Sequence, residues 1–252
     1  MTIGIENEAG SQPGPDILVA TGIVTNRNRF LAGLPPEVFG QIAPFLKERP
    51  LRPGQILHQP GSPAQEICFP YAGAVSIREL LREGDAVAVA LLGPESAVGL
   101  SAGLGSMLPV SRAVVELPGT AGYISTQRFA AVAASSDTLR TLIARHGDAL
   151  LAQVQRTAAC NVRHAAEARV CRWLLQNADA AGAGTLAMTQ ESIGELLGLR
   201  RTTITLTAQS LQAKNVIKYK RGSITIVDPA ALRAIACDCY ATIRNISQQV
   251  EP

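Results

Sequence analysis

The sequence predicts an α+β protein with an N-terminal antiparallel β domain, a long helix, and a C-terminal helix-turn-helix domain that carries a β-hairpin. Short β-rich runs separated by glycines fill residues 51–126, and a long helical pattern begins at Asp137. Two shorter helical patterns then meet at Gly198, within residues 190–209. Hydrophobic residues make up 47% of the 252 residues and charged residues 17%, so packed cores are expected and wholesale disorder is not.

Four segments are expected along the chain. Residues 1–25, rich in glycine, proline and small polar residues, are expected to be a flexible leader. Residues 26–136 are expected to form the β domain, residues 137–163 the long helix, and residues 164–252 the helix-turn-helix domain. The leader lacks the basic start and apolar block of a signal peptide, and no apolar run is long enough to span a membrane. We therefore expect a cytoplasmic protein with no membrane partner.

The first part of the β domain is expected to be a helix over residues 28–46, because Pro35 and Pro36 suit a helix start. The β-rich runs that follow are short, and glycines recur between them. This pattern is typical of an antiparallel sandwich or barrel. The tripeptide at residues 83–85, Glu-Gly-Asp, is a candidate hairpin turn.

The long helical segment is expected to be capped by Asp137 and to extend about 38 Å. That is longer than one small β domain needs, so we expect two such helices to pack together in a homodimer. The alternative is a helix that lies on its own β domain. The apolar and small residues of the segment fall near one stripe, which consists of Leu139, Leu142, Ile143, His146, Leu150, Val154, Thr157 and Asn161.

Residues 190–209 fit a helix-turn-helix in both packing and turn. Gly194 is small where two such helices come closest, and Gly198 suits a backbone conformation that is costly for residues with a Cβ. The apolar positions of the motif are Ile193, Leu197, Leu199 and Ile204. An ordinary helical hairpin would explain the glycines, but it would not explain Arg200 and Arg201 directly after the turn.

Positive charge is concentrated around this motif. Residues 1–164 carry equal numbers of cationic and acidic side chains, whereas residues 198–222 carry six cationic and no acidic ones. The second helix would present its first residues to the major groove, where arginine pairs with guanine and threonine contacts thymine. Residues 218–223 would form a wing on the phosphates. The candidate DNA-binding residues are Thr189, Gln190, Arg200, Arg201, Thr202, Thr203, Thr205, Lys218, Lys220 and Arg221.

The order of these parts resembles the Crp/Fnr family of bacterial transcription regulators. The resemblance lies in "ARVCRWLL", "MTQESIGELLGLRRTTIT" and "RGSITIVD" in the C-terminal half, and in "FPYAGAVS" and "VALLGPESAVGL" in the β domain. It implies a cyclic-nucleotide-binding-like β-roll, a dimerisation helix, a winged helix-turn-helix, and homodimers on palindromic double-stranded DNA. It also implies RNA polymerase as a partner. Arg201 matches the arginine that reads guanine in many members.

Several positions depart from the family pattern. Thr202 stands where many members have a base-reading glutamate, and Leu206 stands in the place of a second arginine. In the β domain, Gly99 is followed by Leu100, whereas nucleotide-binding members have an acid there that binds a ribose hydroxyl. Arg112 lies further along the chain from this pair than the phosphate-binding arginine of those members. We therefore expect no cyclic AMP binding, so that the roll senses another signal or is structural. The alternative is a cyclic-nucleotide receptor with an altered pocket, which would use Gly99 and Arg112.

The cysteines and histidines are expected to serve neither catalysis nor metal binding. Cys237 and Cys239 would point about 200° apart on one helix, which disfavours a shared metal, and Cys160 and Cys171 suit helix packing. No cysteine precedes Cys68, so the N-terminal iron–sulfur cluster of some family members is not expected. The chain has three histidines and no nucleophile motif or phosphate loop. We expect no cofactor, and an enzyme is the least favoured class.

Overall fold

The computed structural model describes residues 27–82, 85–105 and 108–248. The expected leader and two residues of the expected turn at 83–85 lie outside these ranges. The N-terminal half is an antiparallel β domain flanked by short helices. Its elements are α2 (Arg29–Ala32), α3 (Pro36–Ile42), η1 (Ala43–Phe45), β1 (Lys47–Leu51), β2 (Ile56–His58), β3 (Glu66–Leu80), β4 (Ala86–Leu92), η2 (Leu100–Leu104), β5 (Arg112–Ser125) and α4 (Thr126–Ser135).

The sheet is built around the two longest strands. The strand order is β1-β5-β3-β4, with β2 also paired to β5, and every pairing is antiparallel. The register of β3 on β5 shifts at several points between Pro70 and Val75, so both strands bend there and the sheet folds over into a roll. Gly73 and Gly119 allow this bend. A Cβ on Gly119 would lie 1.9 Å from the carbonyl oxygen of Ala72.

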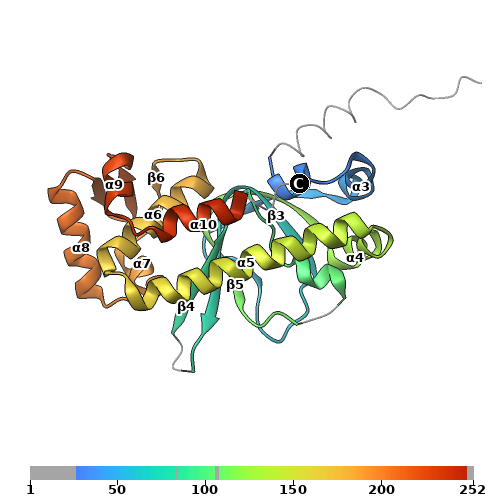
Figure 1. Ribbon diagram of the computed structural model, residues 1–252, viewed down its shortest axis with the longest axis horizontal. Helices are drawn as coiled ribbons and strands as arrows, with labels where there is room; N and C mark the ends of the chain where they lie inside the picture. The colour runs from blue at the N-terminus through green and yellow to red at the C-terminus, as the bar shows by residue number, and fades with distance from the viewer. Residues whose placement is uncertain (1–26, 83–84, 106–107, 249–252) are drawn as a thin grey trace, which may run out of the picture.

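The long helix is α5 (Asp137–Arg163), and it runs along much of the length of the molecule, in front of the strands of the roll in Figure 1. Its N-cap is Ser136, whose side chain accepts from the N–H of Leu139, so Asp137 is the first helical residue and not the cap that we expected. The stripe expected to form a dimer seam is largely turned toward the chain's own β domain. Leu139, Leu142, Ile143 and His146 are all buried.

The C-terminal half is a three-helix unit with a β-hairpin, followed by two more helices. Its elements are α6 (Ala166–Ala181), β6 (Thr185–Leu186), α7 (Gln190–Leu197), α8 (Arg201–Ala213), β7 (Ile217–Lys220), β8 (Ser223–Ile226), α9 (Pro229–Ile235) and α10 (Cys239–Gln248). Helices α6 to α9 gather at one end of the molecule, and α10 returns alongside α5 (Figure 1).

One hydrophobic core joins the two halves. Trp173 and Leu174 of α6 belong to the same buried cluster as Ala74 of β3, Ala88 of β4 and Leu117 of β5. Helix α7 also packs near β4, since a Cβ placed on Gly198 would lie 3.7 Å from Cγ2 of Val87. The helix-turn-helix is therefore packed against the roll and is not joined to it by a linker alone.

The last helical segment departs from the expectation of one continuous helix. Helix α9 ends at Ile235, Ala236 is extended with φ −62° and ψ 148°, and α10 begins only at Cys239. The premise that Cys237 and Cys239 share a helix was therefore wrong. Because a turn separates them, the two thiols can face the same side.

Among the described residues, no helix has both the length and the apolar composition that a membrane crossing requires.

Candidate nucleic-acid interface

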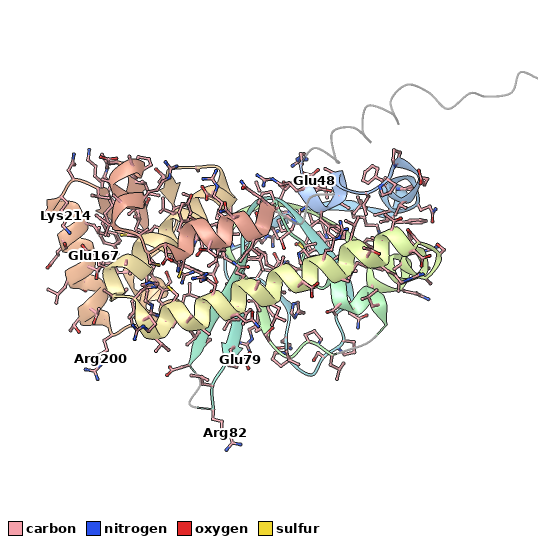
Figure 2. The ribbon with its side chains drawn as sticks, viewed as in Figure 1. Glu48, Glu79, Arg82, Glu167, Arg200 and Lys214 are labelled. Atoms are coloured by element: carbon pink, nitrogen blue, oxygen red, sulfur yellow. The ribbon has the colours of Figure 1, made fainter. Side chains whose placement is uncertain are left out.

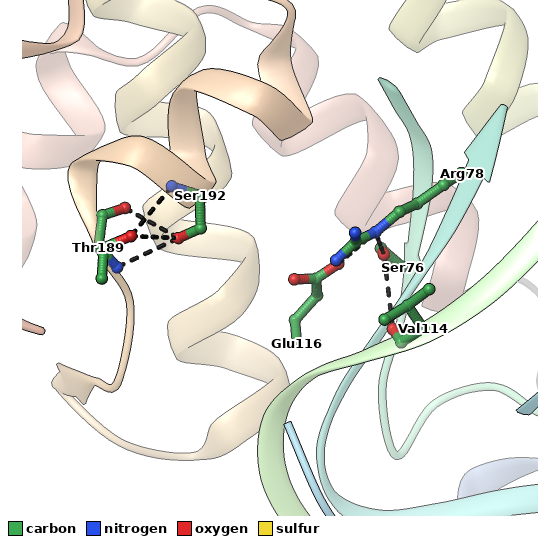
Figure 3. Close-up of polar contacts among 6 residues, drawn as sticks. All are labelled: Ser76, Arg78, Val114, Glu116, Thr189 and Ser192. Atoms are coloured by element: carbon green, nitrogen blue, oxygen red, sulfur yellow. Dashed lines mark hydrogen bonds and ion pairs between the residues drawn. The ribbon is translucent and has the colours of Figure 1, made fainter. Parts of the chain in front are cut away.

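The first helix of the helix-turn-helix begins with a reciprocal cap. The Ser192 N–H donates to Oγ1 of Thr189 over 3.0 Å, and the Thr189 N–H donates to Oγ of Ser192 over 3.1 Å (Figure 3). Two N–H groups that α7 would leave unpaired are satisfied in this way. Thr189 is exposed at this end of α7, so it remains accessible as well as structural.

The turn between the two helices depends on two glycines. Gly198 has a φ of +61°. This left-handed conformation is common at the C-terminal end of a helix, and its free-energy cost is lowest for glycine, which has no Cβ. Gly194 is buried where the helices touch, and a Cβ there would lie 3.1 Å from the carbonyl oxygen of Leu199 and 3.3 Å from Cγ1 of Ile204. Both positions were identified from the sequence, and the structure confirms the packing role of Gly194 and the turn conformation of Gly198.

The second helix starts with exposed cationic residues. Arg200 is the extended N-cap of α8 and Arg201 is its first residue, and the first turn contains no acid. Figure 2 shows the Arg200 side chain directed away from the body of the protein. Among the described residues neither arginine takes part in an ion pair. Their charges are therefore available to an external anion.

The remaining candidate positions on α7 and α8 differ in exposure. Thr202 is exposed, whereas Gln190, Thr203 and Thr205 are half-buried. Thr205 donates to the carbonyl oxygen of Arg201 over 3.0 Å, and its hydroxyl lies 3.4 Å from Oε1 of Gln190. Gln190 is thus brought from α7 to the middle of α8, a contact that the sequence does not reveal.

The wing is the hairpin of β7 and β8, with Arg221 and Gly222 at its tip. Gly222 has a φ of +77°, which the tight turn requires. Lys218, Lys220 and Arg221 are all exposed. The strand β7 is fixed to α8 by the Tyr219 N–H, which donates to Oε1 of Gln212 over 3.1 Å.

One cationic residue of this region is bound internally. Lys214 Nζ lies 3.0 Å from Oε1 of Glu167 on α6, and Ser210 donates to the same oxygen over 2.9 Å (Figure 2). The hydrogen bond from Lys214 is the main cause of the lowered pKa of Glu167. Lys214 therefore anchors α8 to α6. The positive surface is reduced to Arg200, Arg201 and the three wing residues.

Sequence reasoning missed a second anchor of α7. Arg169 is buried on α6, and its Nη2 donates to the carbonyl oxygen of Leu197 over 2.5 Å, at the C-terminal end of α7. That oxygen has no partner within the helix, so Arg169 fixes the position of the turn. The available signal was a pair of cationic residues, Arg169 and Arg172, inside the otherwise apolar run of residues 168–175.

A separate cavity of about 370 Å³ opens between the roll and α5. Gly99, Leu100 and Ser111 are among its lining residues, and His146 and Leu150 line it from α5. No acidic or permanently charged side chain occurs among the described residues that line it. Burial lowers the pKa of His146 to about 4, so this side chain is neutral at neutral pH.

Two family sequence models match the chain. That of the Crp-like helix-turn-helix domain matches residues 168–235, and that of the cyclic nucleotide-binding domain matches residues 48–136. Together the two segments span more than half of the sequence. The chain belongs to the Crp/Fnr family. No curated protein matches it significantly in sequence.

Solved structures of Crp/Fnr regulators share the fold of this chain. A transcriptional regulator of the family from Eubacterium rectale aligns with a TM-score of 0.65 at 20% identity, over 83% of this chain and 98% of its own. FixK2 from Bradyrhizobium japonicum aligns with a TM-score of 0.64 at 19% identity, over 76% and 98%. The c-di-GMP-responsive regulator CLP from Xanthomonas campestris aligns with a TM-score of 0.60 at 17% identity, over 76% and 99%.

The two effector candidates of this Crp/Fnr chain are separated in the roll. Gly99 lines the cavity, with a φ of +88° at the start of η2, but Arg112 is not among the lining residues. Arg112 is half-buried at the start of β5, opposite Arg78. Arg78 is itself occupied by Glu116, 2.7 Å away, and by Ser76 (Figure 3).

Proposed function

We propose that this Crp/Fnr regulator binds a specific double-stranded DNA sequence through the start of α8, while its wing holds the phosphates. The observation that carries the proposal is the unpaired positive surface of Arg200, Arg201, Lys218, Lys220 and Arg221 around a helix-turn-helix. Each of these side chains is exposed, and among the described residues none is in an ion pair. Such a surface suits a polyanion.

The proposed contacts divide between bases and backbone. Arg201 reads a guanine through its O6 and N7, and Thr202 contacts a neighbouring base. Arg200, Thr203, Thr205 and the region of Thr189 and Gln190 contact bases or phosphates at the edges of the groove. Lys218, Lys220 and Arg221 contact phosphates, which position the domain without specifying sequence.

We infer a homodimer that uses the outward face of α5. An exposed heptad-like series runs along this face, in contrast to the stripe that packs on the roll: Thr141, Ala144, Asp148, Leu151, Gln155, Ala158 and Val162. Leu151 is 55% exposed and Val162 is 83% exposed. A second copy of α5 would cover both in a coiled-coil-like contact. A twofold dimer would then read a palindromic site.

The roll is proposed to sense a signal other than cyclic AMP, or to serve as structure. The apolar lining of the cavity and the absence of a charged lining residue among those described support this, since a cyclic phosphate is best held by a bidentate arginine. Calorimetric titration of the protein with cyclic AMP should give no binding heat. Saturable binding of cyclic AMP would establish the altered-pocket receptor instead.

The remaining parts of the proposal follow from the family. We propose RNA polymerase as a partner at promoters and the cytoplasm as the location, because the DNA target is there. The proposal assigns no catalytic activity to the chain.

The experiment that tests the function is selection of bound sites from a random DNA pool by the purified protein. A recovered palindrome with half-sites about one helical turn apart would support a dimeric regulator that needs no effector. Binding that shows a steep salt dependence but no sequence preference would contradict specific readout.

A further inference from the structure

Four potential metal ligands meet where the end of α5 passes the start of α10. Cys160 and His164 come from α5 and its C-cap, Cys237 comes from the turn that separates α9 from α10, and Cys239 is the first residue of α10. Their ligand atoms all lie within 4.8 Å of one another. The three cysteines are buried and all are free thiols. This group is the one such cluster found among the described residues.

Two of the distances between these atoms are close to those of a tetrahedral site. Cys160 Sγ lies 3.5 Å from Cys237 Sγ, and Cys239 Sγ lies 3.6 Å from His164 Nδ1. In a tetrahedron with ordinary zinc bond lengths, two sulfurs lie about 3.8 Å apart, and a sulfur and a nitrogen lie about 3.6 Å apart. These two pairs of ligand atoms therefore need to move only slightly to bind one ion.

The chain reaches this geometry through two local features. Cys160 and His164 are four residues apart, which places them on the same side of the helix end. The extended residue Ala236 breaks the helix before Cys237, so that Cys237 and Cys239 both turn toward α5. Neither feature serves the proposed DNA contacts.

A carboxylate supports the histidine from outside the cluster. Oδ1 of Asp238 lies 3.4 Å from Nε2 of His164, and Oδ2 of the same residue lies 4.0 Å from Arg156. A metal-binding histidine commonly donates its second ring N–H to a carboxylate, which fixes the tautomer and the ring orientation. With the proton on Nε2, the lone pair of Nδ1 points into the cluster.

Buried positive charge next to the cluster matches an anionic metal centre. Arg169 and Arg172 are 8% and 2% exposed, and neither is in an ion pair with a carboxylate among the described residues. Both guanidinium groups interact electrostatically with the Cys160 sulfur. Neutral thiols or a disulfide would offset none of the arginine charge, whereas an anionic metal centre would offset part of it. A divalent ion with three thiolates and a neutral imidazole has a net charge of −1.

We propose that Cys160, His164, Cys237 and Cys239 bind one zinc ion in a tetrahedral site that ties the end of α5 to the start of α10. Three thiols and soft-to-borderline ligand chemistry select zinc over magnesium or calcium. Binding displaces the three thiol protons to solvent and involves no change of oxidation state. All four positions are filled by protein, so the site is structural and not catalytic.

The location of the site gives it a role in the regulator. Helix α5 packs on the roll, and α10 follows α9 after the helix-turn-helix and its wing. A zinc ion there fixes the angle between the two halves at the point where the chain passes from one to the other. The site also encloses residues 160–239 in one loop, so it stabilises the fold of the C-terminal half.

Metal analysis of the full chain, purified under reducing conditions without chelator, tests the proposal. We expect about one zinc per chain by elemental mass spectrometry. After exchange into Co²⁺ we expect the visible absorption of tetrahedral cobalt and a thiolate-to-cobalt charge-transfer band. Cys160→Ser and Cys239→Ser should each lose most of the metal. Cys171→Ser is the matched control, because Cys171 is equally buried but lies outside the cluster, and it should retain the metal.

Other outcomes overturn the proposal. Reduced wild-type protein that neither retains nor takes up Zn²⁺, and gives no thiolate–cobalt band, has no such site. Iron with inorganic sulfide in place of zinc, or a Cys160–Cys237 disulfide that Zn²⁺ cannot replace after reduction, would assign the cluster another chemistry. Loss of metal from Cys171→Ser to the same extent would show a general folding effect. If the Ser variants fail to fold, the cobalt spectrum of the wild type decides.

Discussion

Arg200 and Arg201 are the residues with which α8 begins, and they differ in what they can reach. Arg200 is the extended N-cap and projects from the body of the protein (Figure 2), whereas Arg201 belongs to the first helical turn. A helix that enters the major groove presents its first turn to the base edges. We therefore propose that Arg201 reads the base and that the more outlying Arg200 lies nearer the phosphates.

Arg201→Ala is expected to weaken binding to the selected site by about 1–3 kcal/mol, or about 5- to 150-fold, and to relax the preference at one base position. The reason is the loss of a bidentate contact to guanine. Affinities for the selected and random duplexes, measured by fluorescence anisotropy, check this. Arg52→Ala, an exposed arginine of the roll, is the control and should leave both affinities unchanged. Equal weakening on both duplexes would make Arg201 a phosphate contact.

Lys220→Ala is expected to weaken binding to all duplexes alike and to reduce the salt dependence of the binding constant by about one unit of log–log slope. Lys220 is exposed on the wing strand β7, where it can release one condensed counterion from the DNA. Binding constants measured over a series of salt concentrations give the slope. Lys47→Ala on β1 is the matched control. A slope equal to that of the wild type would remove the wing from the interface.

At the scale of elements, the helix-turn-helix is stabilised from several sides at once. A reciprocal cap begins α7, Arg169 binds its last turn, and Lys214 holds α8 against Glu167. These contacts place the exposed side of α8, and Thr189 of the cap is the one proposed DNA-binding residue that takes part in them. The rigidity of the motif can therefore be tested separately from its binding surface.

Gly198→Ala is expected to lower the free energy of unfolding by about 1–2 kcal/mol. The φ of +61° is costly for alanine, whereas the nearest atom to the new Cβ is 3.7 Å away, so the cost is in the backbone and not in a clash. Urea unfolding followed by circular dichroism measures it. Gly40→Ala in α3, where a Cβ meets nothing within 4 Å, should instead be neutral or stabilising by up to about 1 kcal/mol. Unchanged stability of Gly198→Ala would contradict the role given to this turn.

The sequence was informative where the signal was local. The glycine turn at Gly198 and the wing hairpin at residues 218–223 follow from residues a few positions apart, and the structure confirms them. The break before Cys237 was missed because no glycine or proline marks it. Contacts between distant segments, such as Gln190 with Thr205 or Cys160 with Cys237, depend on how helices pack, and spacing within one segment carries no information on that.

At the scale of the molecule, α5 has two faces with different tasks. Its buried face carries Leu139 and Ile143 against the roll, and its outward face carries Leu151 and Val162 in contact with solvent. The hydrophobic pattern marked the first face as a dimer seam because it is the more apolar of the two. A helix that packs both on its own domain and on the same helix of a second copy needs two apolar faces. In this chain the more apolar face packs in the intramolecular core.

Leu151→Glu is expected to convert the proposed dimer to a monomer without unfolding it. The leucine is 55% exposed in the single chain, so the fold tolerates the charge, but in a twofold α5–α5 contact two carboxylates would meet near the seam and lose their hydration. Light scattering coupled to size exclusion measures the mass, and circular dichroism checks the fold. Ala134→Glu, which adds the same charge at an exposed position of α4, should remain dimeric.

The Leu151→Glu monomer should also lose most of its affinity for a palindrome while keeping weak binding to a half-site, since each copy carries one reading helix. A wild-type monomer, or a dimer that survives Leu151→Glu, would place the contact elsewhere on the surface.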